Sequence, residues 1–367
     1  MVVVQIITTL AYGGAEKICI DLSNGLSQDP SSEVYLISLF DIGEAHRNPA
    51  TIDKRVKLIT LAKRPGLDAR IFYRLYRILS RIKPQIIHTH LTALLYLVPY
   101  IYLKREPFKL FHTVHNVAEK DVIPAAQKVF KHLAKNNLFT AIAISEEIRI
   151  SIREFYGIDS VLIVNFTPKP EKSGRFKIAA EEIKKIKRNS HTKVFLNLAR
   201  ISVAKNQLPL IEAFSELKNE NIVLLMVGGA DIIYTELQSK LVIASQAAGN
   251  VFILGNRDNA TDYLFCSNAY ILPSLYEGLP VSLLEAIALG VVPMCTPVGG
   301  TPSIVIPDQT GFIIDQPDKQ AIKNAIFEYL GTEESKLDVM SESCQKLYSS
   351  KYSLATGLKD HIALYNS

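Results

Sequence analysis

The chain has 367 residues, of which 48% are hydrophobic and 21% charged, and it contains no low-complexity tract. This composition excludes a disordered or fibrous protein, and the length favours two domains, because single hydrophobic cores stop growing near roughly 250–300 residues. The four cysteines have neither Cys-x-x-Cys spacing nor histidines nearby. Their scatter argues against a disulfide framework and against structural zinc, and it favours a cytoplasmic location.

The net charge of +5 is unevenly distributed along the chain. Residues 1–190 hold 29 Lys and Arg against 18 Asp and Glu, a net charge of +11, whereas residues 191–367 hold 12 against 18, a net charge of −6. A basic first half is typical of a surface for polyanions or anionic lipid, although a merely solvated basic face has the same composition. Nucleic acid is not predicted as a partner, because no nucleic-acid-binding motif accompanies the dispersed basic residues. Peripheral association with the inner face of a membrane is left open.

The first half begins with MVVVQIITTL, which lacks the positively charged segment of a signal peptide. We therefore interpret it as a buried strand and not as a signal peptide. Further β-branched runs follow, separated by helix-like segments such as Ala15–Leu26 and Asp68–Ile82. The most apolar segment, Leu91–Leu103, is too short to span a membrane and contains Pro99, so it predicts a buried helix, with interfacial membrane contact as the alternative. The predicted strands are Val2–Thr8, Glu33–Leu39, Val56–Thr60, Ile86–Thr89, Leu110–Val114, Ala141–Ile144 and Val161–Val164.

A charged, helix-like stretch, Ala179–Thr192, precedes a second set of strands, and two helical segments end the chain. Strands that alternate with helices predict parallel sheets covered on both faces. We therefore predict an α/β protein with two doubly wound, Rossmann-like domains, residues 1–175 and 190–349, whose ligands lie outside the carboxyl ends of the strands. The strands of the second half are Val194–Ala199, Ile222–Val227, Val251–Leu254, Ala269–Leu272, Val292–Cys295 and Phe312–Ile314.

Two glycines, Gly13 and Gly14, lie between the first strand and the first helix. Adjacent glycines let backbone N–H groups approach an anion at a helix N-terminus. The sequence here is neither Gly-x-Gly-x-x-Gly nor a P-loop, so it indicates no dinucleotide fingerprint. A tight turn alone would explain the pair equally well.

Four histidines lie near the ends of two neighbouring strands, His88 and His90 in IIHTHL and His112 and His115 in FHTVHN. No carboxylate or cysteine lies at metal-ligand spacing, so a zinc site is not predicted. We interpret His88 and His112 as buried structural residues. His115, where the strand gives way to a loop, is the candidate catalytic residue.

Two cations follow the first strand of the second domain, Arg200 and Lys205 in NLARISVAKNQ. Their position at the carboxyl end of a strand, before a helix that begins near Asn206, suits a diphosphate. Exposed surface cations would be the ordinary interpretation of this motif alone.

The stretch SLYEGLPVSLLEA carries two carboxylates, Glu277 in a turn and Glu285 within an apolar helix. Pro280 lies where the helix begins, so the N–H groups of Gly278 and Leu279 are predicted to face a phosphate. A buried carboxylate is unfavourable unless it is hydrogen-bonded. Glu285 is therefore predicted to accept the hydroxyls of a ribose, and Glu277 to bind the group beyond the phosphates.

Taken together, these motifs resemble the retaining glycosyltransferases of family 4, which have the GT-B fold of two Rossmann-like domains facing across a cleft. The resemblance covers nearly the whole chain, and its most specific element is Glu277 and Glu285 separated by seven residues in EGLPVSLLEAIALG. The supporting segments are GGAE at Gly13–Glu16, TVHN at Thr113–Asn116, VNFTP at Val164–Pro168, ARISVAKN at Ala199–Asn206 and VFILGNRDN at Val251–Asn259.

The resemblance implies a role for each matching residue. Arg200 and Lys205 would neutralise the leaving diphosphate, with help from the N–H groups of Gly14 and of Gly278–Leu279. His115 would contact the transferred sugar, Glu277 would bind a hydroxyl of the donor sugar, and the Gly255–Arg257 stretch, with Asn256 and Arg257, would frame the base. The last helix, about residues 350–367, would pack back onto the first domain. Asn268 stands where the family often has an aspartate, which weakens any assignment of the base.

The resemblance also implies the reaction. Retention without an evident protein nucleophile suggests attack by the acceptor on the face that the diphosphate leaves. No Asp-x-Asp triplet occurs in the sequence, so no metal and no other cofactor is expected. The predicted function is transfer of a hexosyl or N-acetylhexosaminyl group from a nucleotide sugar, preferably a UDP-sugar, to a lipid-linked or cell-surface glycan. The alternatives are a non-catalytic nucleotide-sugar-binding module and another GT-B enzyme, such as a nucleotide-sugar epimerase.

Overall fold

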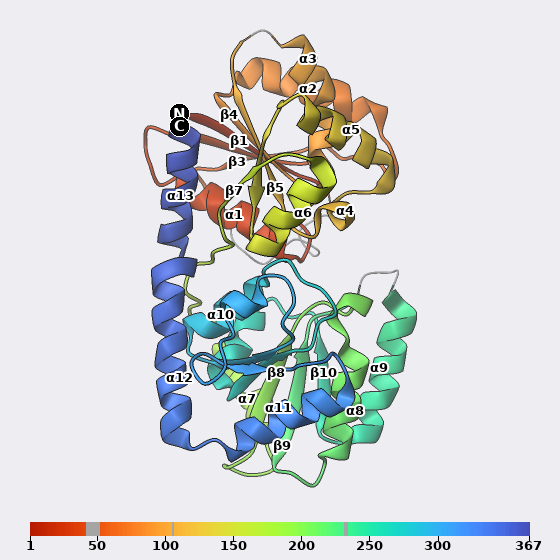
Figure 1. The fold of residues 1–367 in the computed structure, drawn as a ribbon, viewed down its shortest axis with the longest axis vertical. Helices are drawn as coiled ribbons and strands as arrows, with labels where there is room; N and C mark the ends of the chain where they lie inside the picture. Colours follow the sequence, from red (N-terminus) through yellow and green to blue (C-terminus); the bar gives the residue numbers. More distant parts are fainter. Residues whose placement is uncertain (42–51, 105, 231–233) are drawn as a thin grey trace. The chain divides into compact units, whose positions relative to one another are not determined.

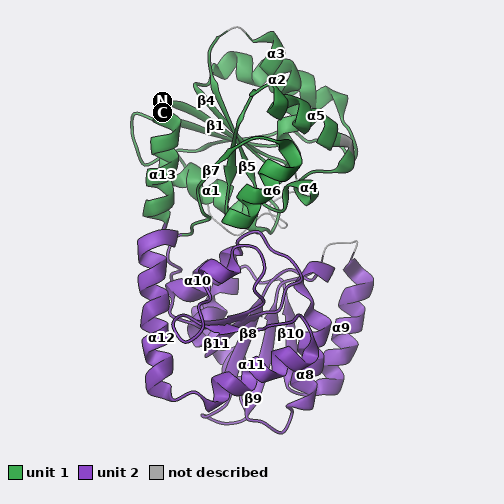
Figure 2. Ribbon diagram, in the orientation of Figure 1, with its two compact units in different colours: residues 1–167, 354–367 green, residues 168–353 purple. Residues whose placement is uncertain are grey.

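The structure is a computed structural model that describes residues 1–41, 52–104, 106–230 and 234–367. It divides into two compact units, shown in green and purple in Figure 2. The first unit comprises residues 1–167 and 354–367, and the second comprises residues 168–353. The sequence also suggested that the segment Asp41–Pro49 lies on the acceptor side, but residues 42–49 lie outside the described part of the chain.

The first unit is built on a parallel sheet of seven strands in the order β3-β2-β1-β4-β5-β6-β7. The strand order reverses between β1 and β4, where Gln5 is in register with His88. All seven strands fall where the alternating β-branched runs predict them. They are β1 Val2–Ile7, β2 Glu33–Ser38, β3 Lys57–Thr60, β4 Ile86–His90, β5 Lys109–Val114, β6 Thr140–Ala143 and β7 Ser160–Leu162.

The helices of the first unit cover this sheet with apolar faces. In α2, Ile71, Leu75 and Leu79 recur every four residues and are buried, and the Asp68 side chain caps the helix by accepting from the N–H of Arg70. The apolar segment Leu91–Leu103 forms a 3-10 turn followed by α3, and the expectation of a buried helix holds only for its first part. The buried residues are Ala93, Leu94, Tyr96, Leu97 and Tyr100, whereas Tyr102 and Leu103 at its end are exposed. The helices are α1 Gly14–Leu26, α2 Ala69–Ile82, α3 Val98–Leu103, α4 Ala118–Asp121, α5 Pro124–Lys135, α6 Glu146–Tyr156 and α13 Leu354–Asn366.

The second unit repeats the design with a parallel sheet of six strands in the order β10-β9-β8-β11-β12-β13. Here the order reverses between β8 and β11. The prediction of two doubly wound domains is thus confirmed, and helices flank each sheet (Figure 1). The strands are β8 Lys193–Leu198, β9 Ile222–Val227, β10 Val251–Gly255, β11 Ala269–Leu272, β12 Val292–Cys295 and β13 Phe312–Ile313. The helices are α7 Phe176–Ile186, α8 Gln207–Glu216, α9 Thr235–Ala248, α10 Val281–Ala288, α11 Lys319–Gly331 and α12 Glu334–Leu347.

The boundary between the units lies earlier than the sequence suggests, at Thr167 and not at residue 175. The reason is a set of polar contacts that ties the connecting segment to the second unit. The backbone N–H of Ser173 donates to Asp262 over 2.9 Å, and the carboxylate of Glu182 in α7 accepts from the hydroxyl of Tyr263. Charge and polarity in the sequence indicated a linker but could not show these contacts.

The last helix, α13, belongs to the first unit, although α12 and the π-helical turn Tyr348–Tyr352 before it belong to the second. It packs on α1 so closely that a Cβ on Gly25 would lie 2.4 Å from Leu358. His361 and Tyr365 of α13 are buried, and the two chain ends lie close together at β1 and α13 (Figure 1). The C-terminal residues are therefore part of the core of the first unit.

Candidate active site

At the carboxyl end of β8, Arg200 and Lys205 lie in a segment whose backbone is held by hydrogen bonds, one of them from a residue that follows β11. The side-chain amide of Gln207 donates to the carbonyl of Arg200 over 2.9 Å, and the N–H of Leu275 donates to the carbonyl of Ala204 over 2.8 Å. Both cations therefore lie at the point where the strand order of this sheet reverses. In doubly wound proteins this point is where ligands bind.

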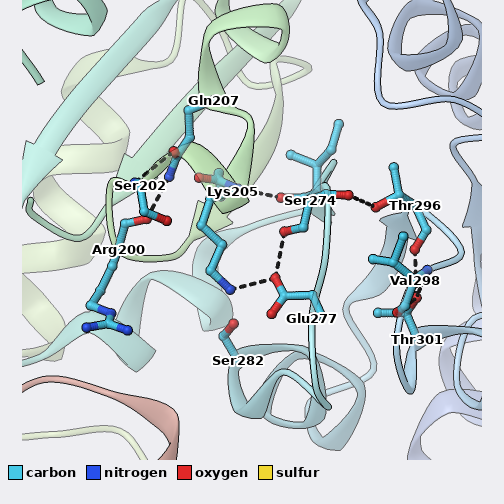
Figure 3. A network of polar contacts seen from close by, with 12 residues as sticks. Arg200, Ser202, Lys205, Gln207, Ser274, Glu277, Ser282, Thr296, Val298 and Thr301 are labelled. Atoms are coloured by element: carbon cyan, nitrogen blue, oxygen red, sulfur yellow. Dashed lines mark hydrogen bonds and ion pairs between the residues drawn. The ribbon is translucent and has the colours of Figure 1, made fainter. Parts of the chain in front are cut away.

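Lys205, Glu277 and Ser274 form one polar cluster (Figure 3). The Nζ atom of Lys205 lies 2.5 Å from Glu277 Oε1, and the hydroxyl of Ser274 donates to the same oxygen over 2.6 Å. Glu277 is only 8% exposed, so these two donors offset the cost of burying its charge. The structure brings Lys205 and Glu277 into direct contact, which the sequence did not predict, while the Arg200 side chain extends away from this pair (Figure 3).

The loop after Glu277 is held by close backbone packing. The N–H of Gly300 donates to the carbonyl of Gly278 over 2.6 Å. Gly299 has a φ of +60°, and a Cβ there would lie 2.3 Å from the carbonyl oxygen of Glu277. Only glycine fits this position, so the segment before Pro280 and the start of α10 is rigidly placed.

Helix α10 is buried along its length, including Glu285, which is 5% exposed. Pro280 caps the helix with a φ of −66°, and the buried Leu279 precedes it. Glu285 is thus a carboxylate buried in an apolar helix, as predicted, while its binding of a ribose stays a prediction.

Asn256 and Arg257 follow β10, on the far side of β9 from Lys205. A Cβ on Gly229 would lie 2.8 Å from the Asn256 side chain, and Gly228, with a φ of +132°, lies against the carbonyl of Ala199. This glycine pair after β9 was not predicted from the sequence, although adjacent glycines at a strand end are a recognisable signal. Arg257 binds the hydroxyl of Tyr263 over 3.2 Å and lies 3.5 Å from a carboxylate oxygen of Glu182, so contacts to α7 and Tyr263 fix its position.

Asn268 has no part in this site. It precedes β11, so it lies at the amino end of the strand, where its side chain accepts from the N–H of Val194 over 2.8 Å. An aspartate oxygen could accept the same hydrogen bond, and at the amino end of β11 this position does not bear on the base.

In the first unit, Gly13 is the N-terminal cap of α1, and Gly14 is its first residue. A Cβ on Gly13 would lie 2.1 Å from an Oε2 atom of Glu16, which is itself buried. A carboxylate therefore already lies against the start of α1, where the sequence predicted an external anion. An anion there would need Glu16 to move aside, so the expectation for Gly13 and Gly14 is weakened.

His115 follows β5 and is partly buried. Its Nε2 atom lies 2.9 Å from Nδ1 of His90, and its backbone N–H donates to Oδ1 of Asp121 over 2.9 Å. Burial lowers the pKa of His115 to about 3. His88 and His112 are fully buried, as predicted, and His90 is fully buried as well.

Asp121 is a second residue that sequence analysis missed. It is buried at the end of α4, and burial raises its pKa to about 7, although the N–H groups of His115 and Asn116 act in the opposite direction. Its Oδ2 atom lies 3.9 Å from Nε2 of His112, and neither atom has a hydrogen-bond partner within the described residues. A lone acid in a short, polar segment gives no sequence signal for such a position.

Across residues 1–41, 52–104, 106–230 and 234–367, no group of three or more His, Cys, Asp or Glu side chains is arranged to hold a metal ion. In the same residues, no helix combines the length and the apolar character needed to cross a membrane.

Two protein-family models match the chain. Residues 12–166 match the family described as Glycosyltransferase Family 4, and residues 179–346 match Glycosyl transferases group 1. The chain belongs to glycosyltransferase family 4. The two matched segments correspond to the two units, so both halves of this glycosyltransferase carry the family's pattern.

Curated relatives and solved structures agree with this assignment. The chain is 27% identical over 307 residues to the Escherichia coli UDP-Gal:alpha-D-GlcNAc-diphosphoundecaprenol alpha-1,3-galactosyltransferase, covering 76% of this chain and 74% of that protein. It is 25% identical over 204 residues to the Bacillus subtilis putative teichuronic acid biosynthesis glycosyltransferase TuaC, covering 56% of this chain and 50% of that protein. Its fold is similar to that of Anabaena HepE, solved with UDP and glucose, with a TM-score of 0.81, 16% identity and 99% coverage of both chains. The fold is that of GT-B glycosyltransferases.

Proposed function

We propose that this glycosyltransferase transfers a hexosyl or N-acetylhexosaminyl group from a UDP-sugar to a hydroxyl of a lipid-linked or cell-surface glycan. The configuration of the sugar would be retained, and no metal would be needed. The observation that carries the proposal is the contact of Lys205 with Glu277, placed with Arg200 at the strand-order reversal of the second unit. The name of the Escherichia coli relative, which specifies a UDP-sugar donor and a diphosphoundecaprenol-linked acceptor, supports the choice of substrates.

The cations of the second unit suit the charge that develops during transfer. As the bond between the anomeric carbon and the diphosphate breaks, negative charge grows on the diphosphate oxygens. Arg200 and Lys205 are fixed positive charges, and preorganised charges stabilise such a transition state without reorganising during the reaction. Glu277 holds Lys205 in place before the donor binds, and Glu285 would hold the ribose.

The remaining steps concern the sugar. The acceptor oxygen would form its bond to the anomeric carbon on the face that the diphosphate leaves, and its proton would pass to a diphosphate oxygen. His115 would contact the transferred sugar. Retention therefore follows from same-face attack, without a covalent intermediate on the protein.

The direct test is a panel of nucleotide sugars, with release of the nucleoside diphosphate followed in the presence and absence of lipid-linked glycan acceptors. We expect one UDP-sugar to be consumed much faster when an acceptor is present, and the anomeric configuration of the product to match the donor. Consumption that needs no acceptor and yields an isomerised sugar would instead indicate an epimerase. Binding without consumption of any donor across the panel would indicate a non-catalytic module.

We also propose that the enzyme docks on anionic membrane, where a lipid-linked acceptor would reside. The support is the net charge of +11 over residues 1–190. The protein should sediment with vesicles containing phosphatidylglycerol at low salt and leave them at high salt, because added salt screens exposed charges. Equal binding to purely zwitterionic vesicles would contradict this proposal.

A further inference from the structure

A chain of hydrogen bonds runs through the first unit from His115 to Thr113. Every member except His115 is at most 3% exposed, so water cannot replace these bonds. The chain crosses β5, β4, β1 and α13, and it lies where the strand order reverses between β1 and β4. In order, the links are His115 Nε2 to His90 Nδ1 at 2.9 Å, His90 Nε2 to Gln5 Oε1 at 3.0 Å, Gln5 Nε2 to Tyr365 Oη at 3.1 Å, Tyr365 Oη to His88 Nδ1 at 2.7 Å, and His88 Nε2 to Thr113 Oγ1 at 2.7 Å.

The orientation of the Gln5 amide gives this chain a direction. A carbonyl oxygen only accepts, so His90 Nε2 must carry the proton that is shared with Gln5 Oε1. A neutral His90 then has a lone pair on Nδ1. His115 Nε2 must therefore be protonated and donate to it.

The same logic holds on the other side of Gln5. Its amide nitrogen donates to Tyr365, which leaves the phenolic hydrogen of Tyr365 for Nδ1 of His88. His88 then carries its proton on Nε2 and donates to Thr113. Each group thus has one consistent role, which is the condition for a stable buried polar network.

We propose that His90 and Gln5 are positioning residues that hold the His115 imidazole as its neutral Nε2–H tautomer, so that Nδ1 accepts a hydrogen bond from a hydroxyl of the transferred sugar. This inference rests on the proposed function, in which His115 contacts that sugar. Among the described residues, the ring of His115 is hydrogen-bonded only through Nε2. Its other nitrogen is thereby the one available to a substrate.

Protonation would not rearrange the chain near neutral pH. Burial lowers the pKa values of His88 and His90 well below the ordinary value of 6.5, and the neighbouring histidines lower them further. The rings of His88 and His90 lie 4.4 Å apart between centroids, so a charge on one would disfavour a charge on the other. Both rings therefore stay neutral, as the directed chain requires.

Tyr365 links this chain to the last helix. Its ring packs on Phe111, with 5.1 Å between centroids, and its hydroxyl is the acceptor for the Gln5 amide. Residues at the C-terminus thus help to fix the orientation of Gln5. Helix α13 therefore contributes to the first unit both by packing and by hydrogen-bonding Gln5.

The decisive experiment measures the tautomer of His115 in the full chain by long-range proton–nitrogen NMR. The protein has eight histidines, so selective labelling with ¹⁵N-histidine gives few signals, and the variant His115→Asn assigns those of His115. In the wild type we expect a protonated Nε2 and an unprotonated Nδ1. A protonated Nδ1 would mean that the chain runs in the opposite direction, which would overturn the proposal without any variant being needed.

Two variants test whether the chain controls this tautomer. Gln5→Met keeps most of the side-chain volume but removes the amide, and we expect the His115 signals to move towards a mixture of tautomers. Tyr365→Phe keeps the ring and removes the hydroxyl, with a smaller shift in the same direction. Tyr329→Phe is the matched control, because it removes a buried hydroxyl that donates to the carbonyl of Asn268 within the second unit, and it should leave the spectrum unchanged. Unchanged His115 signals in folded Gln5→Met would refute the positioning role.

Kinetics then separate this inference from the proposed function. If the protein transfers sugar, Gln5→Met should lower kcat about tenfold to a hundredfold and change the KM of the donor less than about threefold, because the group lost positions a residue that acts on the sugar. Equal losses in Gln5→Met and Tyr329→Phe would indicate mere destabilisation. If the wild type proves inactive with every donor, the proposed function fails, whereas the tautomer of His115 is still measured.

Discussion

The two units have closely related topologies and place opposite kinds of chemistry at the same point of the sheet. In the first unit, the reversal between β1 and β4 holds Gln5, His88 and His90, all uncharged and fully buried. In the second unit, the reversal between β8 and β11 holds ions, with Lys205 in contact with Glu277. A parallel sheet thus supplies a position but no chemistry, and the side chains beside the reversal of the strand order decide whether it orients a neutral ring or binds an anion.

The difference teaches how each unit tolerates buried polar groups. The neutral chain in the first unit is satisfied internally at each link, and Nδ1 of His115, at its end, is left for a ligand. Glu277 in the second unit is satisfied by Lys205 and Ser274, which leaves a cation that a diphosphate can share. The predictions below act on these two arrangements.

The largest effect is expected for Lys205→Met. Loss of one fixed positive charge at the leaving group should lower kcat about 10²- to 10³-fold, the usual cost of removing one preorganised donor. Lys193→Met is the control, because Lys193 also forms an ion pair, with Glu334, but lies at the start of β8. Steady-state rates of the two variants decide the matter, and similar losses in both would contradict a role specific to Lys205.

The two glutamates should separate binding from turnover. Glu285→Ala should weaken binding of the free nucleoside diphosphate roughly tenfold to a hundredfold, the cost of a charge-assisted hydrogen-bond pair. Glu277→Ala should leave that affinity unchanged or raise it, because Lys205 is released from its partner, and its loss should appear in kcat. Calorimetry with UDP on both folded variants tests this, and a weaker affinity in Glu277→Ala that matches Glu285→Ala would reverse our assignment.

In the first unit, Asp121→Asn should change how stability depends on pH. Because burial raises the pKa of Asp121 to about 7 in the folded state, its contribution is full below the unfolded pKa near 4 and is lost as the pH rises through 7. Asparagine mimics the protonated acid. As the pH rises from 5 to 8, the free energy of unfolding of the variant should therefore increase by about 1–2 kcal/mol relative to that of the wild type.

Denaturant unfolding at several pH values measures this difference. Asp53→Asn is the control, because hydrogen bonds from Arg55 lower the pKa of Asp53. Its contribution to stability is present above the unfolded pKa near 4, so the difference between this variant and the wild type should not change between pH 5 and pH 8. If the difference in the free energy of unfolding between the wild type and Asp121→Asn is the same at pH 5 and at pH 8, Asp121 does not titrate as predicted.

The smallest effect is expected from chelation of metals. Because fixed side-chain charges are proposed to stabilise the leaving diphosphate, excess EDTA should change the initial rate less than about twofold. Loss of activity that manganese restores would show that a metal shares this task.

The strands, both sheets and the order of the candidate residues could be predicted from the sequence, because alternating β-branched runs and strand-end motifs depend on local chemistry. Glu285 could likewise be predicted as a carboxylate buried in an apolar helix. Asp121 and Gln5 could not be predicted, since a single polar residue in an acidic turn or an apolar strand has no periodic pattern. Nor could the sequence show that Glu16 lies against Gly13 at the start of α1.

The sequence by itself determined which residues stand at the ends of strands, and with them the family and the kind of chemistry. Only the tertiary structure decided which of these side chains meet. Lys205 and Glu277 are 72 residues apart and share one hydrogen bond, and Gln5 and Tyr365 are 360 residues apart and share another. Partners at such separations are fixed by strand order and by the return of the last helix, which depend on packing of the whole chain and not on any local preference.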